Sequence, residues 1–256
     1  MEQKNRWIKM AQDYDEMAPY LVPQYNFLQS AMLEYLDIQN FSQPVVVDLG
    51  AGSGIFLERI LSANATAHCY WIDSSGGFLD IAQQKLAPYQ DRVTFVLATM
   101  EEPWEQQLTQ LPDFIFSMSA IHHLLNEEKM ELYQRCFVIL ADNGWLVNID
   151  EMKTIYDDAY YHSLLNWARH VDRSATVIPA EKTDLYHQWV DHFDKWKERN
   201  IDNFGQPKVK GDDLHERFTL QMQWLKAAGF VNVDVFVKYH LWCAVGGQKL
   251  QQRESP

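Results

Sequence analysis

Cysteines are few in this sequence, and no two of them are close together. Its 256 residues include three, Cys69, Cys136 and Cys243, with no Cys-x-x-Cys spacing. A disulfide framework uses an even set of cysteines, and most structural zinc sites draw on closely spaced pairs. We therefore expect neither, and a reducing cytoplasm is the simplest location for the chain.

Long apolar runs are also missing. No uninterrupted apolar stretch approaches the roughly 20 residues of a membrane-spanning helix. The first residues, Met1 to Arg6, are polar and do not resemble the apolar core of a signal peptide. We expect no membrane partner and no secretion signal.

Positive charge is scarce. Lys and Arg number 22 against 35 Asp and Glu, which gives a formal net charge of −13. Nucleic-acid binding depends on basic patches that displace counterions, and the longest basic cluster here is Lys208 and Lys210. The charge balance therefore disfavours a nucleic-acid partner. Apolar residues make up 47% of the chain, an ordinary share for a globular protein with a sizeable core.

Strand-like and helix-like segments alternate from about residue 44 to residue 150. Short runs rich in β-branched and aromatic residues, typical of strands buried on both faces, are separated by helix-length spacers. This order predicts a parallel sheet with right-handed crossovers. The five predicted strands are Val45–Leu49, Cys69–Ile72, Val93–Leu97, Asp113–Ser117 and Trp145–Ile149. The predicted helices between them include Ser53–Ala63, one stopped by Pro88, and Glu127–Leu140.

The last part of the chain has a different pattern. Asp213, with a glutamate three residues later, predicts the capped start of a helix. Gly229 would end that helix, with Phe230 packing back on its last turn. Two strand-like runs follow with a very short link, which permits only an antiparallel hairpin. They are Val231–Val237 and His240–Val245.

Two segments lie outside this pattern. Residues 151–212 are helical and rich in Trp, Tyr and His, which predicts an insertion before the last helix that acts as a lid. Residues 1–40 predict two helices, split near Pro19 and Pro23. We expect one α/β domain over residues 1–256, with a doubly wound, seven-stranded and mostly parallel sheet that ends in an antiparallel C-terminal hairpin.

A glycine-rich turn after the first predicted strand is the strongest functional signal. Asp48 precedes Gly50, Gly52 and Gly54 in the stretch Val-Asp-Leu-Gly-Ala-Gly-Ser-Gly. Glycines let a backbone take positive φ and approach a ligand, and the following helix start offers free N–H groups. A dinucleotide fingerprint would place its third glycine at Ile55. The observed spacing therefore disfavours a nicotinamide oxidoreductase.

This turn resembles motif I of the class I S-adenosylmethionine-dependent methyltransferases, an acidic residue followed by Gly-x-Gly-x-Gly. Further landmarks of that family follow in order: Asp73 at the end of the second predicted strand, then Ser74 and Phe78. The resemblance covers roughly residues 7–150 and 213–248. Ordinary dinucleotide-binding sheets lack the reversed last strand that this sequence predicts.

The resemblance implies a Rossmann-like methyltransferase fold with S-adenosyl-L-methionine as cofactor. The carboxylate of Asp73 would accept hydrogen bonds from the ribose hydroxyls, and Phe78 would lie against adenine. Tyr14, within the N-terminal helices 1–40, would cover the bound cofactor. The cofactor-binding residues expected from this resemblance are Tyr14, Asp48, Gly50, Ala51, Gly52, Gly54, Asp73, Ser74, Phe78, Thr99, Met100, Ser117 and Ser119.

The candidate catalytic residues are His122 and His123 after the fourth predicted strand and Asp150 at the end of the fifth. Ligands of open α/β sheets bind at the carboxyl ends of the strands. Methyl transfer from a sulfonium is an in-line displacement with a neutral leaving group. The protein therefore mainly aligns the reactants and excludes water, with a general base where the nucleophile is a hydroxyl. Because no His-Glu-x-x-His motif occurs, we expect no metal.

Aromatic residues recur within the insertion. Trp189, Phe193 and Trp196 follow helical spacing, which predicts a stripe that faces the core. Tyr160 and Trp167 belong to a second aromatic group, which we interpret as a possible pocket for a flat or cationic substrate.

We expect a methyltransferase that acts on a small-molecule acceptor, as a monomer or a homodimer. Two alternatives stay open: an RNA or protein methyltransferase, and a non-catalytic or modified-cofactor S-adenosylmethionine-binding protein. The stretch Ser117–Ala120 lacks the Asn-Pro-Pro-Tyr-like motif that would favour the first alternative. The sequence does not reveal the acceptor, or whether O, N, S, C or As receives the methyl group.

Overall fold

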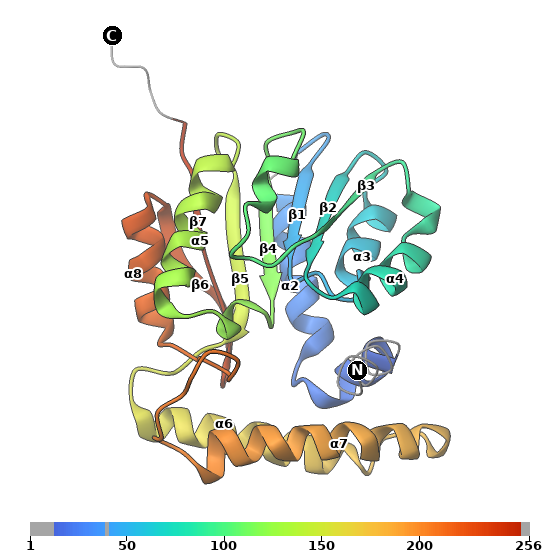
Figure 1. Ribbon diagram of the computed structural model, residues 1–256, viewed down its shortest axis with the longest axis vertical. Helices are drawn as coiled ribbons and strands as arrows, with labels where there is room; N and C mark the ends of the chain where they lie inside the picture. The colour runs from blue at the N-terminus through green and yellow to red at the C-terminus, as the bar shows by residue number, and fades with distance from the viewer. Residues whose placement is uncertain (1–12, 39–40, 252–256) are drawn as a thin grey trace.

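A seven-stranded sheet forms the centre of the protein (Figure 1). The computed structural model describes residues 13–38 and 41–251. The strand order is β3-β2-β1-β4-β5-β7-β6, in which β7 runs antiparallel to both β5 and β6 and the other pairs are parallel. The strands are β1 (Val45–Leu49), β2 (His68–Asp73), β3 (Val93–Leu97), β4 (Phe114–Met118), β5 (Trp145–Glu151), β6 (Val231–Tyr239) and β7 (Trp242–Gln248). The predicted fold class is confirmed.

Helices cover both faces of the sheet because its central strands are apolar on both sides. On β1, Val46 joins one buried cluster and Val47 the other, as the two-residue period of a strand requires. The first cluster packs under α2 (Tyr25–Ile38), α3 (Ile55–Ala63) and α4 (Gly76–Lys85). The second packs under α5 (Asn126–Ile139) and α8 (Phe218–Ala228).

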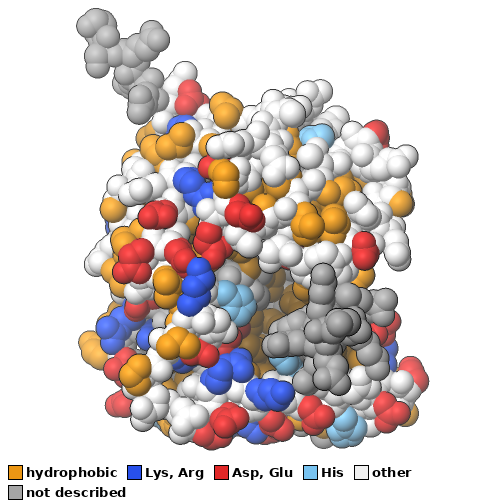
Figure 2. All heavy atoms as spheres, in the orientation of Figure 1, with side chains coloured by type: hydrophobic (Ala, Val, Ile, Leu, Met, Phe, Trp, Pro, Cys, Tyr) orange, Lys and Arg blue, Asp and Glu red, His pale blue; other side chains and the backbone are white. Residues whose placement is uncertain are grey.

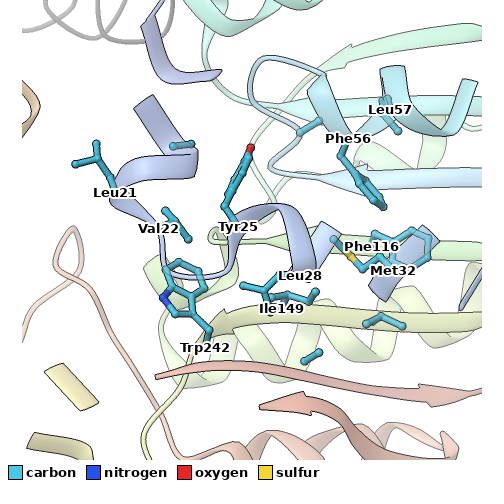
Figure 3. Packing of buried hydrophobic residues seen from close by; sticks show 14 of the residues in the cluster. Leu21, Val22, Tyr25, Leu28, Met32, Phe56, Leu57, Phe116, Ile149 and Trp242 are labelled. Atoms are coloured by element: carbon cyan, nitrogen blue, oxygen red, sulfur yellow. The ribbon is translucent and has the colours of Figure 1, made fainter. Parts of the chain in front are cut away.

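Helix α2 belongs to the core of the domain. Figure 3 shows Leu28 and Met32 of α2 directed at the sheet, near Ile149 of β5 and Phe116 of β4. Leu28 is fully buried and Met32 is 2% exposed. The N-terminal helices therefore complete one face of the sheet as well as reaching its carboxyl edge.

Three predicted helix boundaries differ from the structure. Residues 13–21 are helical through Pro19, and the break falls at residues 22–24, where Gln24 has a φ of 62°. Helix α3 begins at Ile55, two residues later than predicted, because Gly54 has a left-handed φ of 77°. Helix α4 ends at Lys85, and Pro88 lies in the short 3-10 turn that follows.

The predicted capping role of Asp213 is wrong. Helix α8 begins at Phe218, with Arg217 at its cap position. The carboxylate of Asp213 instead accepts hydrogen bonds from Asn200 (2.8 Å) and Arg199 (3.1 Å), so it is not available to a helix start. The helix end was predicted correctly: Gly229 has a φ of 110°, and the Phe230 N–H donates to the Leu225 carbonyl at 3.1 Å.

The insertion forms a helical layer at the carboxyl ends of the strands (Figure 1). Its helices are α6 (Asp157–Ser174) and α7 (Thr183–Lys197), followed by a π-helical turn over Glu198–Asp202. The Trp167 indole N–H donates to the Leu21 carbonyl at 2.7 Å, which fixes this layer to residues 13–21.

Phe193 and Trp196 are buried beside Trp167, so the apolar stripe predicted for these residues is confirmed, and Trp167 belongs to the same buried cluster. Within the described ranges, no helix is long and apolar enough to cross a membrane. All three cysteines are buried free thiols.

We expect the substitution Gly246→Ala to destabilise the fold. A Cβ there would lie 2.4 Å from the Leu146 carbonyl oxygen and 2.6 Å from a ring carbon of Phe236. Overpacking of this kind costs about 1–3 kcal/mol, measurable as a lower midpoint in urea unfolding. Gly76→Ala is the matched control, because its Cβ would meet nothing within 4 Å. Equal midpoints for the two variants would contradict this packing.

Candidate functional site

The glycine turn between β1 and α3 has three left-handed residues, as its sequence predicts. The φ angles of Gly50, Gly52 and Gly54 are 72°, 52° and 77°. A Cβ on Gly54 would meet Leu86 at 3.0 Å, so this glycine permits α3 and α4 to pack closely. A Cβ on Gly52 would meet only Phe78, at 3.9 Å. Gly52 therefore faces open space in which a ligand can approach its backbone.

Asp73 anchors this turn from the end of β2. One carboxylate oxygen accepts the Gly52 N–H at 2.9 Å, and the other accepts the Ser75 N–H at 2.8 Å. The Trp71 indole N–H donates to the Gly52 carbonyl at 2.8 Å. Burial raises the pKa of Asp73 above its usual value, although these backbone donors act in the opposite direction. Sequence reasoning assigned Asp73 only to the ribose and missed this structural role.

Three further expected residues support the turn from β1, from β4 and from the turn itself. Asp48 is 4% exposed, and burial, together with the nearby Asp73, raises its pKa to about 8. The Ser117 hydroxyl is fully buried and donates to the Leu49 carbonyl at 2.8 Å. The Ala51 N–H donates to the carbonyl of Ile72 at 3.0 Å. None of these groups is directed at solvent.

Residues that follow β4 and β3 complete the edge of the sheet around the glycine turn. Ser119 has a φ of 57°, and its buried hydroxyl has no hydrogen-bond partner among the described residues. The Met100 side chain comes within 3.1 Å of the Cβ position on Gly50. Ser74 and Thr99 are exposed at the same edge. The Thr99 N–H donates to the Glu102 carboxylate.

Aromatic rings from three segments meet beside Gly52. The ring centroid of Tyr14 lies 6.1 Å from that of Phe78 on α4 and 5.8 Å from that of Trp189 on α7. Burial, followed by the charge of Glu151, raises the pKa of Tyr14 to about 12. The N-terminal helix therefore reaches Phe78, the residue expected to lie against adenine, and the insertion reaches Tyr14.

Asp15 ties the N-terminal helix to the turn. Its carboxylate accepts a hydrogen bond from the Ser53 hydroxyl and pairs with the Lys85 ammonium. These contacts join residues 13–21 to the start of α3 and the end of α4, which places Tyr14 at the cofactor edge.

The three catalytic candidates come together at the same edge. His122 Nδ1 lies 2.5 Å from one carboxylate oxygen of Asp150, and the other oxygen accepts the His122 backbone N–H at 2.8 Å. The His123 ring lies 4.0 Å from the His122 ring, centroid to centroid, and His123 is exposed. The loop that carries both histidines begins at Ala120, which touches Gly50.

Residues far away in the sequence complete this polar cluster. His122 Nε2 lies 3.9 Å from Asp213, and His215 Nε2 lies 2.7 Å from the Glu151 carboxylate. Tyr160 shares a 2.7 Å hydrogen bond with His215 Nδ1, so it belongs to this cluster. Sequence reasoning missed Asp213 and His215 as site residues, because nothing local marks a loop that returns after a long insertion.

The charges in the cluster depend on one another. Burial alone would lower the pKa of His122, but Asp150 and Glu151 outweigh it and raise that pKa to about 9. Burial raises the pKa of Glu151 to about 8, and Asp213 adds to the effect. Burial lowers the pKa of His215 well below the usual histidine value. The cationic imidazole of His122 therefore lies among carboxyl groups and beside the neutral imidazole of His215.

Open space lies next to these groups. Figure 2 shows a hollow between the sheet and the helical layer, with histidine and apolar side chains inside it. A cavity of about 470 Å³ adjoins the cluster, and its lining includes Tyr160, Arg199, Lys208 and His215. The histidines His162, His170, His187 and His192 are not part of this cluster.

Together the sheet order and the glycine turn define a nucleoside-binding α/β protein of the methyltransferase type. A family model described as a methyltransferase domain matches residues 46–144, from β1 to the turn before β5. This match supports membership of the class I S-adenosylmethionine-dependent methyltransferases, whose cofactor is S-adenosyl-L-methionine.

Relatives agree with this membership. Carboxy-S-adenosyl-L-methionine synthase 1 of Yersinia pseudotuberculosis is 27% identical over 199 residues, 75% of this chain and 80% of that protein. Human N-acetylserotonin methyltransferase with S-adenosylmethionine bound matches at a TM-score of 0.58 and 13% identity, over 97% of this chain and 57% of that one. A putative S-adenosyl-L-methionine-dependent methyltransferase of Methanococcus maripaludis matches at 0.58 and 15%, over 96% and 94%.

At these low identities the solved structures establish the fold alone. The chain spans only a little over half of several of them, including 55% of a methyltransferase named SibL. The chemical class of the acceptor therefore has to be inferred from the residues of the site.

We expect Asp73→Ala to weaken S-adenosylmethionine binding. Loss of a charge-assisted hydrogen bond costs about 1–3 kcal/mol, or roughly 5- to 150-fold in Kd, which titration calorimetry would measure. Asp91→Ala, an exposed aspartate before β3, is the control. Because Asp73 also holds Gly52, thermal unfolding of each variant must accompany the titration. A folded Asp73→Ala protein with unchanged affinity would contradict the assignment.

Gly52→Val tests the turn independently of Asp73. Its side chain would extend into the open space in front of Gly52, so we expect binding to be lost. A folded variant that still binds S-adenosylmethionine would show that the ligand lies elsewhere.

Proposed function

We propose that this methyltransferase transfers the methyl group of S-adenosylmethionine to a small-molecule acceptor by in-line displacement. The observation that carries the proposal is the left-handed Gly52 turn, held by Asp73 beside open space at the carboxyl edge of the sheet. An edge of this kind is where open α/β sheets bind nucleosides.

The cofactor is proposed to lie across the turn. Its amino-acid end approaches the backbone of Gly50 and Gly52, and its ribose hydroxyls donate to Asp73. Adenine lies against Phe78, with Met100 on the side toward Gly50. Tyr14 covers the bound molecule, a role supported by its contacts with Phe78 and Trp189.

The acceptor is proposed to occupy the hollow beside the polar cluster. His122 adjoins His215, which lines the cavity, and Asp150 positions His122 through the 2.5 Å contact to Nδ1. Because Ala120 touches Gly50, the loop that carries the histidines begins at the cofactor turn. These three residues therefore remain the candidates for acting on the acceptor.

A small acceptor is supported by the enclosure of the site. The helical layer of α6 and α7 packs against residues 13–21 through Trp167 and through Ser174, whose hydroxyl donates to the Tyr20 carbonyl at 2.6 Å. A layer fixed in this way excludes water and bulky polymers from the edge. The net charge of −13 disfavours nucleic acid for a separate reason.

A second candidate function is synthesis of a modified sulfonium cofactor. It is favoured by the name of the Yersinia relative, a carboxy-S-adenosyl-L-methionine synthase. It is also favoured by Arg199, whose buried Nε has no hydrogen-bond partner among the described residues and which lines the cavity beside the cluster. A guanidinium in that position suits a carboxylate-bearing reactant.

The experiment that separates these functions is a screen of acceptor classes with mass analysis of the products. Methyl transfer gives S-adenosylhomocysteine and a methylated acceptor. Synthesis of a modified cofactor gives a carboxylated sulfonium nucleoside and no methylated acceptor. If neither product forms although S-adenosylmethionine binds, the protein is a non-catalytic binding module and the proposal fails.

We expect His123→Ala to lower kcat by roughly 100-fold, the lower end of what a group acting on the acceptor's proton contributes. The Kd for S-adenosylmethionine should stay unchanged, because His123 is proposed to act on the acceptor and not on the cofactor. His162→Ala, an exposed histidine on α6, is the matched control. An equal effect of both variants on kcat would remove His123 from the site.

A further inference from the structure

We infer that His122, His123 and Asp213 form a binding site for one divalent transition-metal cation such as Zn²⁺, and that this cation holds the acceptor. The part about the acceptor rests on the proposed function, whereas metal binding does not. The sequence predicted no metal, because the two histidines are adjacent and Asp213 is remote from them.

The distances suit shared ligands. Each of the three residues offers one nitrogen or oxygen, and all of these atoms lie within 4.8 Å of one another, the one such group found among the described residues. His122 Nε2 and Asp213 Oδ1 are 3.9 Å apart, too far for a hydrogen bond. Two ligands on one ion with bonds of about 2.1 Å are separated by roughly 3 to 4 Å. The gap between the two side chains therefore has the size of an ion.

His122 is oriented as a metal ligand. Asp150 is 2.5 Å from Nδ1 and also accepts the His122 backbone N–H, so a proton on Nδ1 is fixed toward the carboxylate. A carboxylate on the other ring nitrogen is the usual support of a metal-binding histidine. Nε2 is thereby left to face Asp213.

Asp213 is fixed in a similar way. Its Oδ2 accepts from Asn200 Nδ2 at 2.8 Å and from Arg199 Nη2 at 3.1 Å, which leaves Oδ1 as the atom toward His122. Lys208 donates to the Asp213 carbonyl at 2.8 Å and further holds this loop. Two of the three ligands are thus buried and positioned before any ion arrives, and the third, His123, is exposed.

The local charge favours a cation. Three buried carboxyl groups, those of Asp150, Glu151 and Asp213, border the site. Arg199 pairs with the Asp213 oxygen that does not face His122, Lys208 donates to the Asp213 backbone carbonyl, and the Lys129 ammonium donates to the Leu214 carbonyl, so none of these three cations occupies the gap between His122 Nε2 and Asp213 Oδ1. A divalent ion between His122 and Asp213 would reduce the repulsion among these carboxylates.

Two nitrogens and one oxygen suit a borderline cation and leave positions open. An acceptor hydroxyl or thiol bound there loses its proton to solvent more readily, because the ion stabilises the anion. Its O or S then forms a bond to the methyl carbon while the sulfonium S–C bond breaks. The electron pair of that bond returns to sulfur, and neutral S-adenosylhomocysteine leaves. Binding at a fixed ion would also account for an acceptor site beside the cofactor turn.

The test uses the full chain, stripped of metal by dialysis against a chelator and titrated with Co²⁺. We expect one equivalent to bind with the visible absorption of a four- or five-coordinate Co²⁺ ion, and Zn²⁺ to displace it. His123→Ala and Asp213→Asn should weaken binding roughly 100-fold, and His162→Ala should not. Asp150→Asn should weaken it 10- to 100-fold, in the range of other lost supports of a metal-binding histidine.

Because Asp213 also holds Asn200, thermal unfolding of Asp213→Asn is measured as well, and the exposed His123 provides a variant that should fold. Absence of stoichiometric Co²⁺ binding overturns the inference, and so does wild-type affinity in folded His123→Ala. Turnover that persists in chelator, with no Co²⁺ binding, refutes the metal and leaves the proposed function intact. Co²⁺ binding without any product in the acceptor screen refutes the function and leaves the metal site.

Discussion

The hydrogen bond from the Gly52 N–H to the Asp73 carboxylate is the contact on which the site depends. It joins the glycine turn to the neighbouring strand and fixes a backbone that only glycine adopts readily. The N-terminal helix attaches to the next residue through Asp15 and Ser53, and α4 follows from Ser75. A shift of the turn would displace the aromatic residues beside Gly52, the proposed cofactor site and the loop that carries His122 and His123.

Two groups of residues lie at this edge of the sheet: those that support the turn, and those that border the space for a ligand. Ser117, Asp48 and Gly54 are buried within the scaffold, whereas Gly52, Phe78 and Ser119 border the space for a ligand. The polar cluster lies farther along the same edge, between the sheet and the helical layer. A cofactor side and an acceptor side thus share one edge, and the loop from Ala120 to His123 connects them.

The sequence was sufficient to predict the structural features that depend on local chemistry. Runs of β-branched residues indicate buried strands, and the glycine spacing indicates the turn. Five parallel strands, the hairpin and the left-handed turn were therefore all predicted. Long-range pairing was not predictable. The acidic pattern at Asp213 looks like a helix cap, and only the folded chain brings Arg199 and Asn200 to that carboxylate. Likewise, the hydrogen bond from the Gly52 N–H to the Asp73 carboxylate cannot be inferred from the sequence.

The central claim is that the turn after β1 binds a sulfonium nucleoside. Calorimetric titration of the purified protein with S-adenosylmethionine and then with S-adenosylhomocysteine measures this most directly. The account predicts one site per chain, for which the two ligands compete. No heat and no competition from either ligand at millimolar concentration would contradict it.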